Sequence, residues 1–116
     1  MDTWPEVTSE ARVATAMPRR YLAQLCKHFQ HKLPVTLAED HGRIEFTGGV
    51  CALEATDDTL ILRLAADEAA LARLEEVVAR HLLRFAFREP PEIRWTRAAR
   101  AEARTDPGPG APDGTA

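Results

Sequence analysis

The sequence lacks the long apolar runs and the targeting segments that would place a protein in or across a membrane. None of its apolar stretches approaches the roughly 18 residues that a membrane-spanning helix needs. Its first residues, MDTWPEVTSEAR, have neither the basic start nor the apolar stretch of a secretory signal. We therefore expect a cytoplasmic protein with no membrane partner.

Cysteine is scarce, and the common motifs of catalysis are missing. The 116 residues include two cysteines, which excludes a disulfide framework, and both thiols are expected to be reduced. No dinucleotide-binding, P-loop, zinc-protease, paired-cysteine or nucleophile-elbow motif is present. The sequence thus predicts no bound cofactor and favours a binding or accessory role over an enzyme. The formal net charge of −3 argues against nucleic acid as a partner.

What is present is the composition of one globular domain. Hydrophobic residues make up 45% of the chain and charged residues 28%, and a chain of this length can bury one core without staples. We expect a flexible N-terminus over residues 1–8 and a single α+β domain over residues 9–97. Residues 98–116, rich in Pro, Gly and Ala, are expected to form a disordered tail.

The middle of the domain predicts a β-meander whose register can be derived. Two-residue turns at Gly48-Gly49 and Asp57-Asp58 set Phe46 opposite Cys51 and Cys51 opposite Leu64. Because side chains alternate along a strand, a slip of one residue would invert every assignment. Both turns select the same buried face, which consists of Ile44, Phe46, Cys51, Leu53, Ala55, Leu60, Leu62 and Leu64.

Two amphipathic helices flank this meander. The first begins at Pro18, which suits a first helical turn, and ends near Lys32, because Pro34 disfavours a helical conformation in the residue before it. The second is capped by Asp67 and runs to about Ala86. Their apolar stripes are Tyr21, Leu22, Leu25, Cys26 and Phe29 on the first, and Leu71, Leu74, Val77, Val78, Leu82 and Phe85 on the second.

Further strands are expected at residues 9–15, 35–38 and 92–96, the last with Ile93 and Trp95 facing inward. The element order is therefore β-α-(β)-β-β-β-α-β. The meander has one apolar face, and each helix has one apolar stripe. This pattern predicts a two-layer α+β sandwich, in which both helices cover one face of a mostly antiparallel sheet.

The hexapeptide CKHFQH, residues 26–31, raises the question of a metal site. On a helix Cys26 faces the core while the two histidines point away from it, so the three side chains cannot share an ion. A metal would need further ligands from the loop that follows. The candidate ligands are His28 and His31, at i and i+3, with His41, Asp40 and Glu39. The competing interpretation is a buried Cys26 beside two surface histidines, with no metal.

His81 lies at the edge of the second helix's apolar stripe. It is a candidate acid or base for catalysis, because partial burial tunes an imidazole across neutral pH. No serine or cysteine is an obvious nucleophile for it, since both cysteines are expected in the core, where thiols are inert. The alternative is a half-buried packing residue with one ring nitrogen bonded to the backbone.

Charged residues are expected on two surfaces. The second helix and the segment after it carry an arginine stripe that could bind an anion or an acidic partner, or could be a solvated face: Arg73, Arg80, Arg84, Arg88, Arg94 and Arg97. On the outer face of the sheet, Arg43 is expected opposite Glu54, and Glu45 in line with Ala52 and Arg63. If this face formed a homodimer, Ile61 would be the contact to test.

Three segments resemble a known family: SEARVATAMPRRYLAQLCKHFQHKLPV, EDHGRIEF and LARLEEVVARHLLRFAFREPPEIRWTR. Together they are similar to small bacterial proteins grouped as domain of unknown function 2218, over residues 9–97. Some of those proteins are encoded beside iron–siderophore utilisation genes. The resemblance implies a fold and an iron-related context, and the family motifs include histidines at positions 28, 31, 41 and 81. It supplies no catalytic residues.

Three functional hypotheses follow. The first is a small cytosolic binding or accessory domain that is not an enzyme, with a protein partner or a second copy of the chain as possible partners. The second is a protein associated with a metal or an iron siderophore through its surface histidines. The third is a small hydrolase or isomerase with His81 as acid or base.

Overall fold

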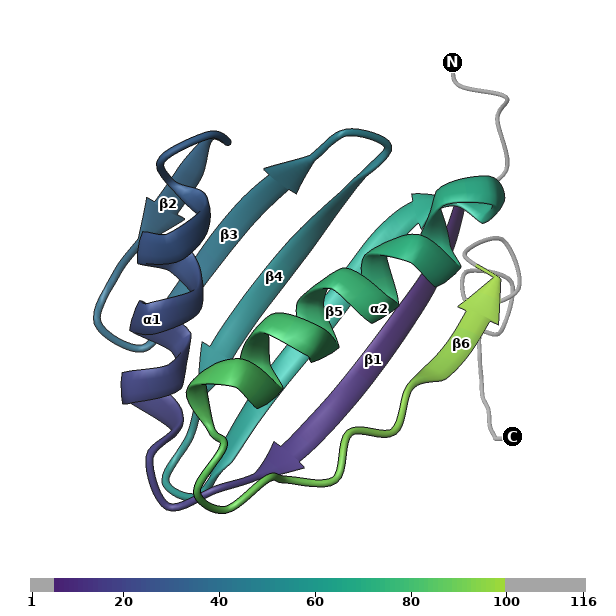
Figure 1. Cartoon of the computed structure of the whole chain (residues 1–116). Helices are drawn as coiled ribbons and strands as arrows, with labels where there is room; N and C mark the ends of the chain where they lie inside the picture. The colour runs from purple at the N-terminus through teal and green to yellow at the C-terminus, as the bar shows by residue number, and fades with distance from the viewer. Residues whose placement is uncertain (1–5, 100–116) are drawn as a thin grey trace, which may run out of the picture.

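In the computed structural model, which describes residues 6–99, a six-stranded sheet carries two helices on one of its faces (Figure 1). Neighbouring strands are antiparallel, and their order across the sheet is β2-β3-β4-β5-β1-β6. The expected two-layer α+β sandwich and its element order are confirmed. The flexible N-terminus and the tail expected at the two ends fall largely outside the described residues. The elements are β1 (Glu6–Ala14), α1 (Pro18–Phe29), β2 (Val35–Leu37), β3 (His41–Phe46), β4 (Gly49–Ala55), β5 (Thr59–Asp67), α2 (Glu68–Phe85) and β6 (Thr96–Ala99).

Both helices begin where the sequence predicts, for local reasons. Pro18 occupies the first turn of α1, where a missing N–H leaves no helical hydrogen bond unmade. The side chain of Asp67 accepts a 2.9 Å hydrogen bond from the N–H of Ala70 and so caps α2. α1 ends at Phe29, earlier than the expected Lys32, because the N–H of Lys32 already turns back to the Phe29 carbonyl at 3.0 Å. Neither helix has an apolar stretch long enough to cross a bilayer, within the part of the chain described.

The meander registers are confirmed in one hairpin and wrong in the other. Between β4 and β5 every derived pair is observed. Between β3 and β4 the turn is Thr47-Gly48 rather than Gly48-Gly49, so Phe46 lies opposite Gly49 and not opposite Cys51. Because this shift moves the partner by an even number of residues, each side chain keeps its face. The predicted buried face is therefore correct although the predicted turn is not.

The two adjacent glycines are required for different physical reasons, which explains why the turn was predicted at the wrong position. Gly48 has a φ of 92°, a left-handed conformation that glycine adopts without strain. Gly49 begins β4, where a Cβ atom would lie 2.6 Å from the Cβ of Ala66 and 2.7 Å from Cδ1 of Leu74. Gly48 is therefore required by the turn and Gly49 by close packing. In the sequence, two adjacent glycines look the same as a two-residue turn.

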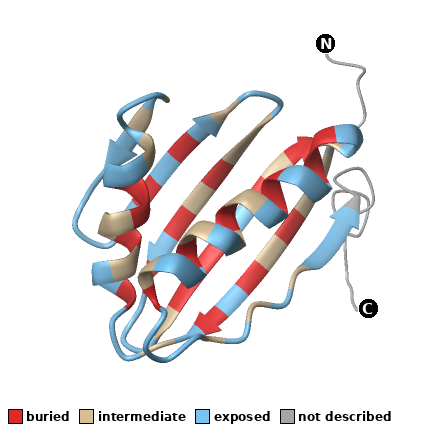
Figure 2. Ribbon diagram, in the orientation of Figure 1, coloured by how far each residue is buried: buried red, intermediate tan, exposed pale blue. Residues whose placement is uncertain are grey.

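The core lies between the inner face of the sheet and the two helices (Figure 2). Along β3, β4 and β5 buried positions alternate with more exposed ones, except that Ile61 of β5 is also buried, and all eight residues of the predicted face are buried or packed against the core. Both cysteines belong to this core, as predicted. The helices contribute Leu22, Leu25, Leu71, Leu74, Val78 and Leu82.

The two strands at the chain ends differ from their predicted bounds. β1 begins at Glu6, where it pairs with Asp67 of β5, so it is longer than the expected strand at 9–15. β6 covers Thr96–Ala99 rather than residues 92–96. Ile93 and Trp95 do pack against the core, but from an extended connection before the strand. The alternation of apolar residues correctly predicted that Ile93 and Trp95 pack against the core, but it wrongly predicted a hydrogen-bonded strand there. Burial alone produces such an alternation.

A buried acid that the sequence reading missed joins three elements. Glu75 of α2 is 8% exposed and accepts a 2.6 Å hydrogen bond from the hydroxyl of Ser9 on β1. Arg97 of β6 donates to both of its carboxylate oxygens, at 2.9 and 2.6 Å. The Arg97 hydrogen bonds lower the pKa of Glu75, outweighing the opposite effect of burial, and Ser9 adds to the lowering. We infer that this cluster fixes the last strand to the helix layer.

We predict that Glu75→Gln lowers the free energy of unfolding by about 1–3 kcal/mol at pH 7, because an amide cannot accept both arginine hydrogen bonds. Urea unfolding measures this change. Glu76→Gln is the matched control, because exposed Glu76 contacts Arg80 only at 3.8 Å and its loss should change stability by less than about 0.5 kcal/mol.

The same contacts predict the pH dependence of stability. The folded-state pKa of Glu75 lies below its ordinary value of 4.5, so the unfolded chain binds the proton more readily. The stabilisation is complete above pH 4.5 and is lost as the pH falls through the lower, folded-state pKa. The difference between wild type and Glu75→Gln should therefore shrink in acid, and an equal difference at pH 7 and pH 3 would contradict this account.

Candidate functional site

Within residues 6–99 no helix lies on the outer face of the sheet, and the side chains of this face form regular rows across the strands. One row consists of small or apolar residues on four adjacent strands: Val50, Ala65, Thr8 and Ala98. The next row on this face combines charged and small residues: Arg43, Ala52, Arg63, Glu10 and Thr96. Both rows follow from the register alone, because alternate residues of each strand must share one face.

These rows enclose a hollow of about 950 Å³ on the outer face. Short side chains form its floor, because alanines and one valine occupy the middle of the face. Longer side chains at these positions would fill the space. Its lining includes four arginines and one glutamate: Arg12, Arg43, Arg63, Arg94 and Glu10. The hollow therefore combines an apolar floor with a predominantly basic border.

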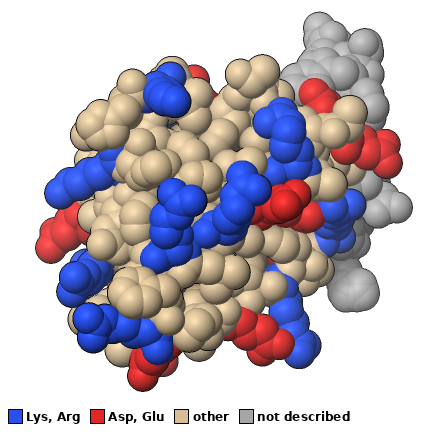
Figure 3. Space-filling view, in the orientation of Figure 1, with Lys and Arg blue, Asp and Glu red and all other residues tan. Residues whose placement is uncertain are grey.

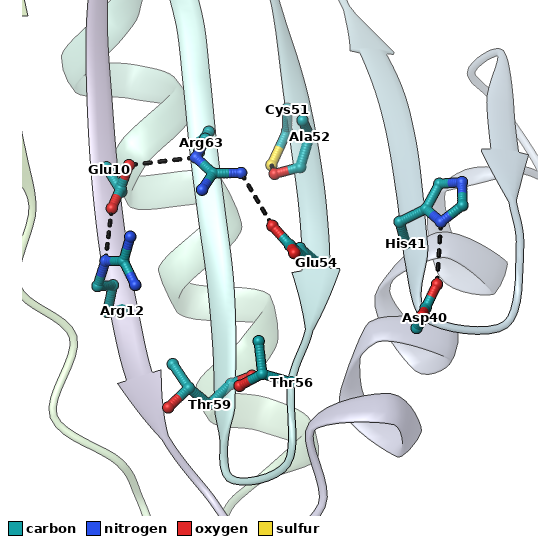
Figure 4. Close-up of polar contacts among 10 residues, drawn as sticks. All are labelled: Glu10, Arg12, Asp40, His41, Cys51, Ala52, Glu54, Thr56, Thr59 and Arg63. Carbon is teal, nitrogen blue, oxygen red and sulfur yellow. Dashed lines mark hydrogen bonds and ion pairs between the residues drawn. The ribbon is translucent and has the colours of Figure 1, made fainter.

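Ion pairs connect the charged residues of this face across three strands (Figure 4). Arg63 of β5 lies between two acids, with Nε 3.2 Å from Glu10 of β1 and Nη1 3.2 Å from Glu54 of β4. Arg12 donates to the other oxygen of Glu10 at 2.7 Å. Burial acts to raise the pKa of Glu10, but the hydrogen bonds and charges of Arg12 and Arg63 outweigh it and lower that pKa. This network holds Arg63 and Arg12 in fixed positions.

Two cross-strand pairs expected on this face are wrong, and Ile61, the residue suggested for a homodimer contact, is buried. Arg43 lies opposite Ala52, not Glu54, because the β3–β4 turn is shifted. Its carboxylate contact is Glu45 on its own strand, at 3.8 Å. Glu45 lies opposite Val50 rather than in line with Ala52. Ile61 is 4% exposed, so the chain itself already covers it.

A second, smaller hollow of about 340 Å³ adjoins the first and shares Ala52 and Arg63 with it. It contains two of the predicted metal-ligand candidates, His41 and Asp40, whose side chains contact at 3.0 Å (Figure 4). The hydrogen bond from His41 lowers the pKa of Asp40. Both side chains are more than half exposed, so this pair remains hydrated.

The histidines are distributed differently from the sequence hypothesis. His28 and His31 are both exposed, His31 in the turn after α1, but His28 contacts a residue of the other helix. Its ring centroid lies 4.7 Å from that of His81 on α2. His81 is half-buried, and its Nδ1 bonds to the Val77 carbonyl at 2.7 Å, as the packing interpretation predicted.

The candidate metal ligands do not converge on one point. Within residues 6–99, no three histidine, cysteine, aspartate or glutamate side chains are close enough to hold one metal ion. The structure instead forms two separate pairs, His41 with Asp40 and His28 with His81. Sequence spacing could not show the second pair, because it depends on how the two helices lie against each other.

The arginine stripe of α2 is partly used within the protein. Arg73 donates to the carbonyl of Thr47 at 3.1 Å, and Arg80 lies 3.8 Å from Glu76. Arg97 binds the buried Glu75, and Arg88 lies over the ring of Phe87. Basic and acidic side chains are interspersed over the helix-bearing side (Figure 3). The interpretation as a solvated face therefore fits this side better than an anion site does.

The sequence pattern of a bacterial family, described as "Uncharacterized protein conserved in bacteria (DUF2218)", matches residues 10–96. The chain belongs to this family. This match confirms the family resemblance of the three segments quoted above. The NMR structure of PA4090 from Pseudomonas aeruginosa is similar to it, with 40% identity and a TM-score of 0.63. The likeness covers 79% of this chain and 95% of that chain. No curated protein matches the chain.

The two thiols of this DUF2218 chain are free and buried. Burial raises the pKa of Cys26 to about 11. For Cys51, burial and the neighbouring Cys26 together raise the pKa to about 12. Because only the thiolate is a nucleophile, neither cysteine serves as one in the folded state.

We predict that both thiols react at least about 100-fold more slowly with an aromatic disulfide reagent in the native state than in urea at pH 8. Raising a thiol pKa from about 8.5 to about 11 alone lowers the thiolate fraction roughly 200-fold at that pH. An added surface thiol, Ala72→Cys on the exposed side of α2, should react rapidly in the native state. Rapid native reaction of the wild-type chain would show that the core opens.

Proposed function

We propose that this protein is a non-catalytic binding module that holds a small ligand on the outer face of its sheet. The ligand has an apolar body and an anionic group. The observation that carries this proposal is the 950 Å³ hollow, with its small apolar floor and its four arginines. Ligand sites in proteins typically have volumes of about 300–1,000 Å³, mostly apolar walls and a few placed polar groups.

Among the four arginines, Arg43 is the best placed to bind the anion. Arg63 is held by two acids, Arg12 by Glu10, and Arg94 by Glu92. Among the described residues, Arg43 has one acidic contact, Glu45 at 3.8 Å, so its guanidinium can turn to a ligand with little loss. A guanidinium fork matches a carboxylate or a phosphate in two parallel hydrogen bonds.

The proposal includes a cytoplasmic location, which the two free thiols support. An enzyme using His81 has less support, because the Nδ1 of His81 is bonded to the backbone and both thiols are buried. An iron–siderophore role remains a hypothesis from the family resemblance alone.

Titration with decanoate, followed by amide chemical shifts, tests the proposal. We expect saturable binding with a Kd below about 1 mM, with the largest shifts at Ala52, Ala65 and Thr8. Decanol, which has the same chain without the charge, should bind about 10-fold more weakly, because one charge-assisted hydrogen bond contributes about 1.5 kcal/mol. Arg43→Ala should produce a similar loss for decanoate and none for decanol.

Ala65→Leu is expected to abolish binding, because it fills the floor of the hollow from the solvent side without touching the core. Its matched control is Ala72→Leu, on the exposed side of α2, and Arg80→Ala is the control for Arg43→Ala. Shifts that spread over the helix face, or equal binding by the Ala65→Leu variant, would refute this location.

A further inference from the structure

Two imidazoles from different helices meet on the helix-bearing side of the molecule, away from the outer hollow. His28 lies in the last turn of α1, and His81 lies in α2, close to that helix's last turn. Their ring centroids are 4.7 Å apart, and the ring planes are inclined by 44°. Phe29 and Phe85 contact these rings at their edges, with centroids 5.0 and 5.9 Å from His28. The pair is thus supported by aromatic neighbours and reachable from solvent through exposed His28.

The hydrogen bonding of His81 prepares one nitrogen for a ligand. Its Nδ1 lies 2.7 Å from the carbonyl oxygen of Val77, and a carbonyl can only accept, so Nδ1 carries the proton. The neutral ring then has its lone pair on Nε2. This arrangement, with one ring nitrogen donating to a carbonyl and the other free, is the usual one for histidines that bind metals.

Basic residues lie close to the pair. Arg84 and Lys32 are near enough to His28 to act on it electrostatically. Their charges oppose a bound cation, so the expected affinity is moderate.

The spacing of the rings fits a shared ion. A metal at about 2.0–2.1 Å from a ring nitrogen lies about 3.2 Å from that ring's centre. Two ligating rings then have centres about 4.5 Å apart for a right angle at the metal and about 5.2 Å apart for a tetrahedral angle. The observed 4.7 Å lies between these values and closer to the right angle.

We propose that His28 and His81 form a two-histidine site for a divalent transition metal that accepts ligands at right angles, Cu(II) or Ni(II). Imidazole nitrogen suits both ions, and Cu(II) forms the strongest complexes of the divalent first-row series. Within residues 6–99 no third side chain of the usual metal-binding types joins the pair, so water completes the coordination. This inference does not rest on the proposed function, because the two sites share no residue.

Calorimetric titration of the full chain with Cu(II), together with electron paramagnetic resonance, tests the proposal. We expect one site with a Kd of about 10 µM and a spectrum with nitrogen couplings from two imidazoles. His28→Phe keeps an aromatic ring against Phe29 and Phe85 but removes the ligand nitrogen. It should weaken binding at least 10-fold, as should His81→Ala, and each should remove one imidazole from the spectrum. Circular dichroism establishes that each variant is folded.

Two matched variants decide between this pair and other histidines. His41→Ala and His31→Ala each remove one exposed histidine outside the pair, and both should leave the affinity unchanged within twofold. If His31→Ala weakened binding as much as His28→Phe, the site would be His28 with His31 at the end of α1 and the proposal would be wrong. An affinity weaker than about 1 mM, or equal binding by the His81→Ala variant, would also overturn it.

Discussion

The strand register is the constraint on which the rest of this structure depends. Across β4, β5 and β1, Leu53 lies opposite Leu62 and Leu62 lies opposite Ala11, and the next row on the same face, Ala55, Leu60 and Val13, is also apolar. A slip of one residue in any of these strands would expose its buried apolar residues and bury its charges. The apolar residues therefore hold each strand in one register, and that register turns Cys51 of β4 toward the helices.

The same register determines the outer face. Residues that alternate with the leucines must share the other side of the sheet, whatever they are, and here they are small in one row and small or charged in the next. The charged residues then satisfy one another as a network centred on Arg63 rather than as isolated pairs. Where no long side chain stands, the surface is hollow. The proposed ligand surface is thus a consequence of side-chain size on a face that neither α1 nor α2 covers.

Polar contacts inside the helix layer join elements that are distant along the chain. Glu75 connects α2 with β1 and β6 through Ser9 and Arg97, and a carboxylate this buried is stable because both of its oxygens accept hydrogen bonds, two of them from a guanidinium. The His28–His81 contact is of another kind, because these rings lie at the rim of the core, where packing and solvent access coexist. One cluster fixes the fold, and the other is placed where an ion from solvent can reach it.

The sequence by itself determined the helices, the inward face of the meander and the burial of both cysteines. These features are local, since a capping aspartate, a proline in a first turn and the alternation of leucines act over a few residues. It also determined that His81 would be half-buried, from its place beside Val77 and Val78. The Gly48-Gly49 turn and the strand at 92–96 were wrong, because close packing and burial leave the same residue pattern as a turn or a strand.

Only the tertiary structure decided which residues that are distant along the chain come into contact. The Glu75–Arg97 pair joins residues 22 positions apart, and the His28–His81 pair depends on the placement of two helices over one sheet. The row from Val50 to Ala98 likewise needs four strands to be set side by side. Such contacts arise from the packing of whole elements, and spacing along the chain carries no information about them.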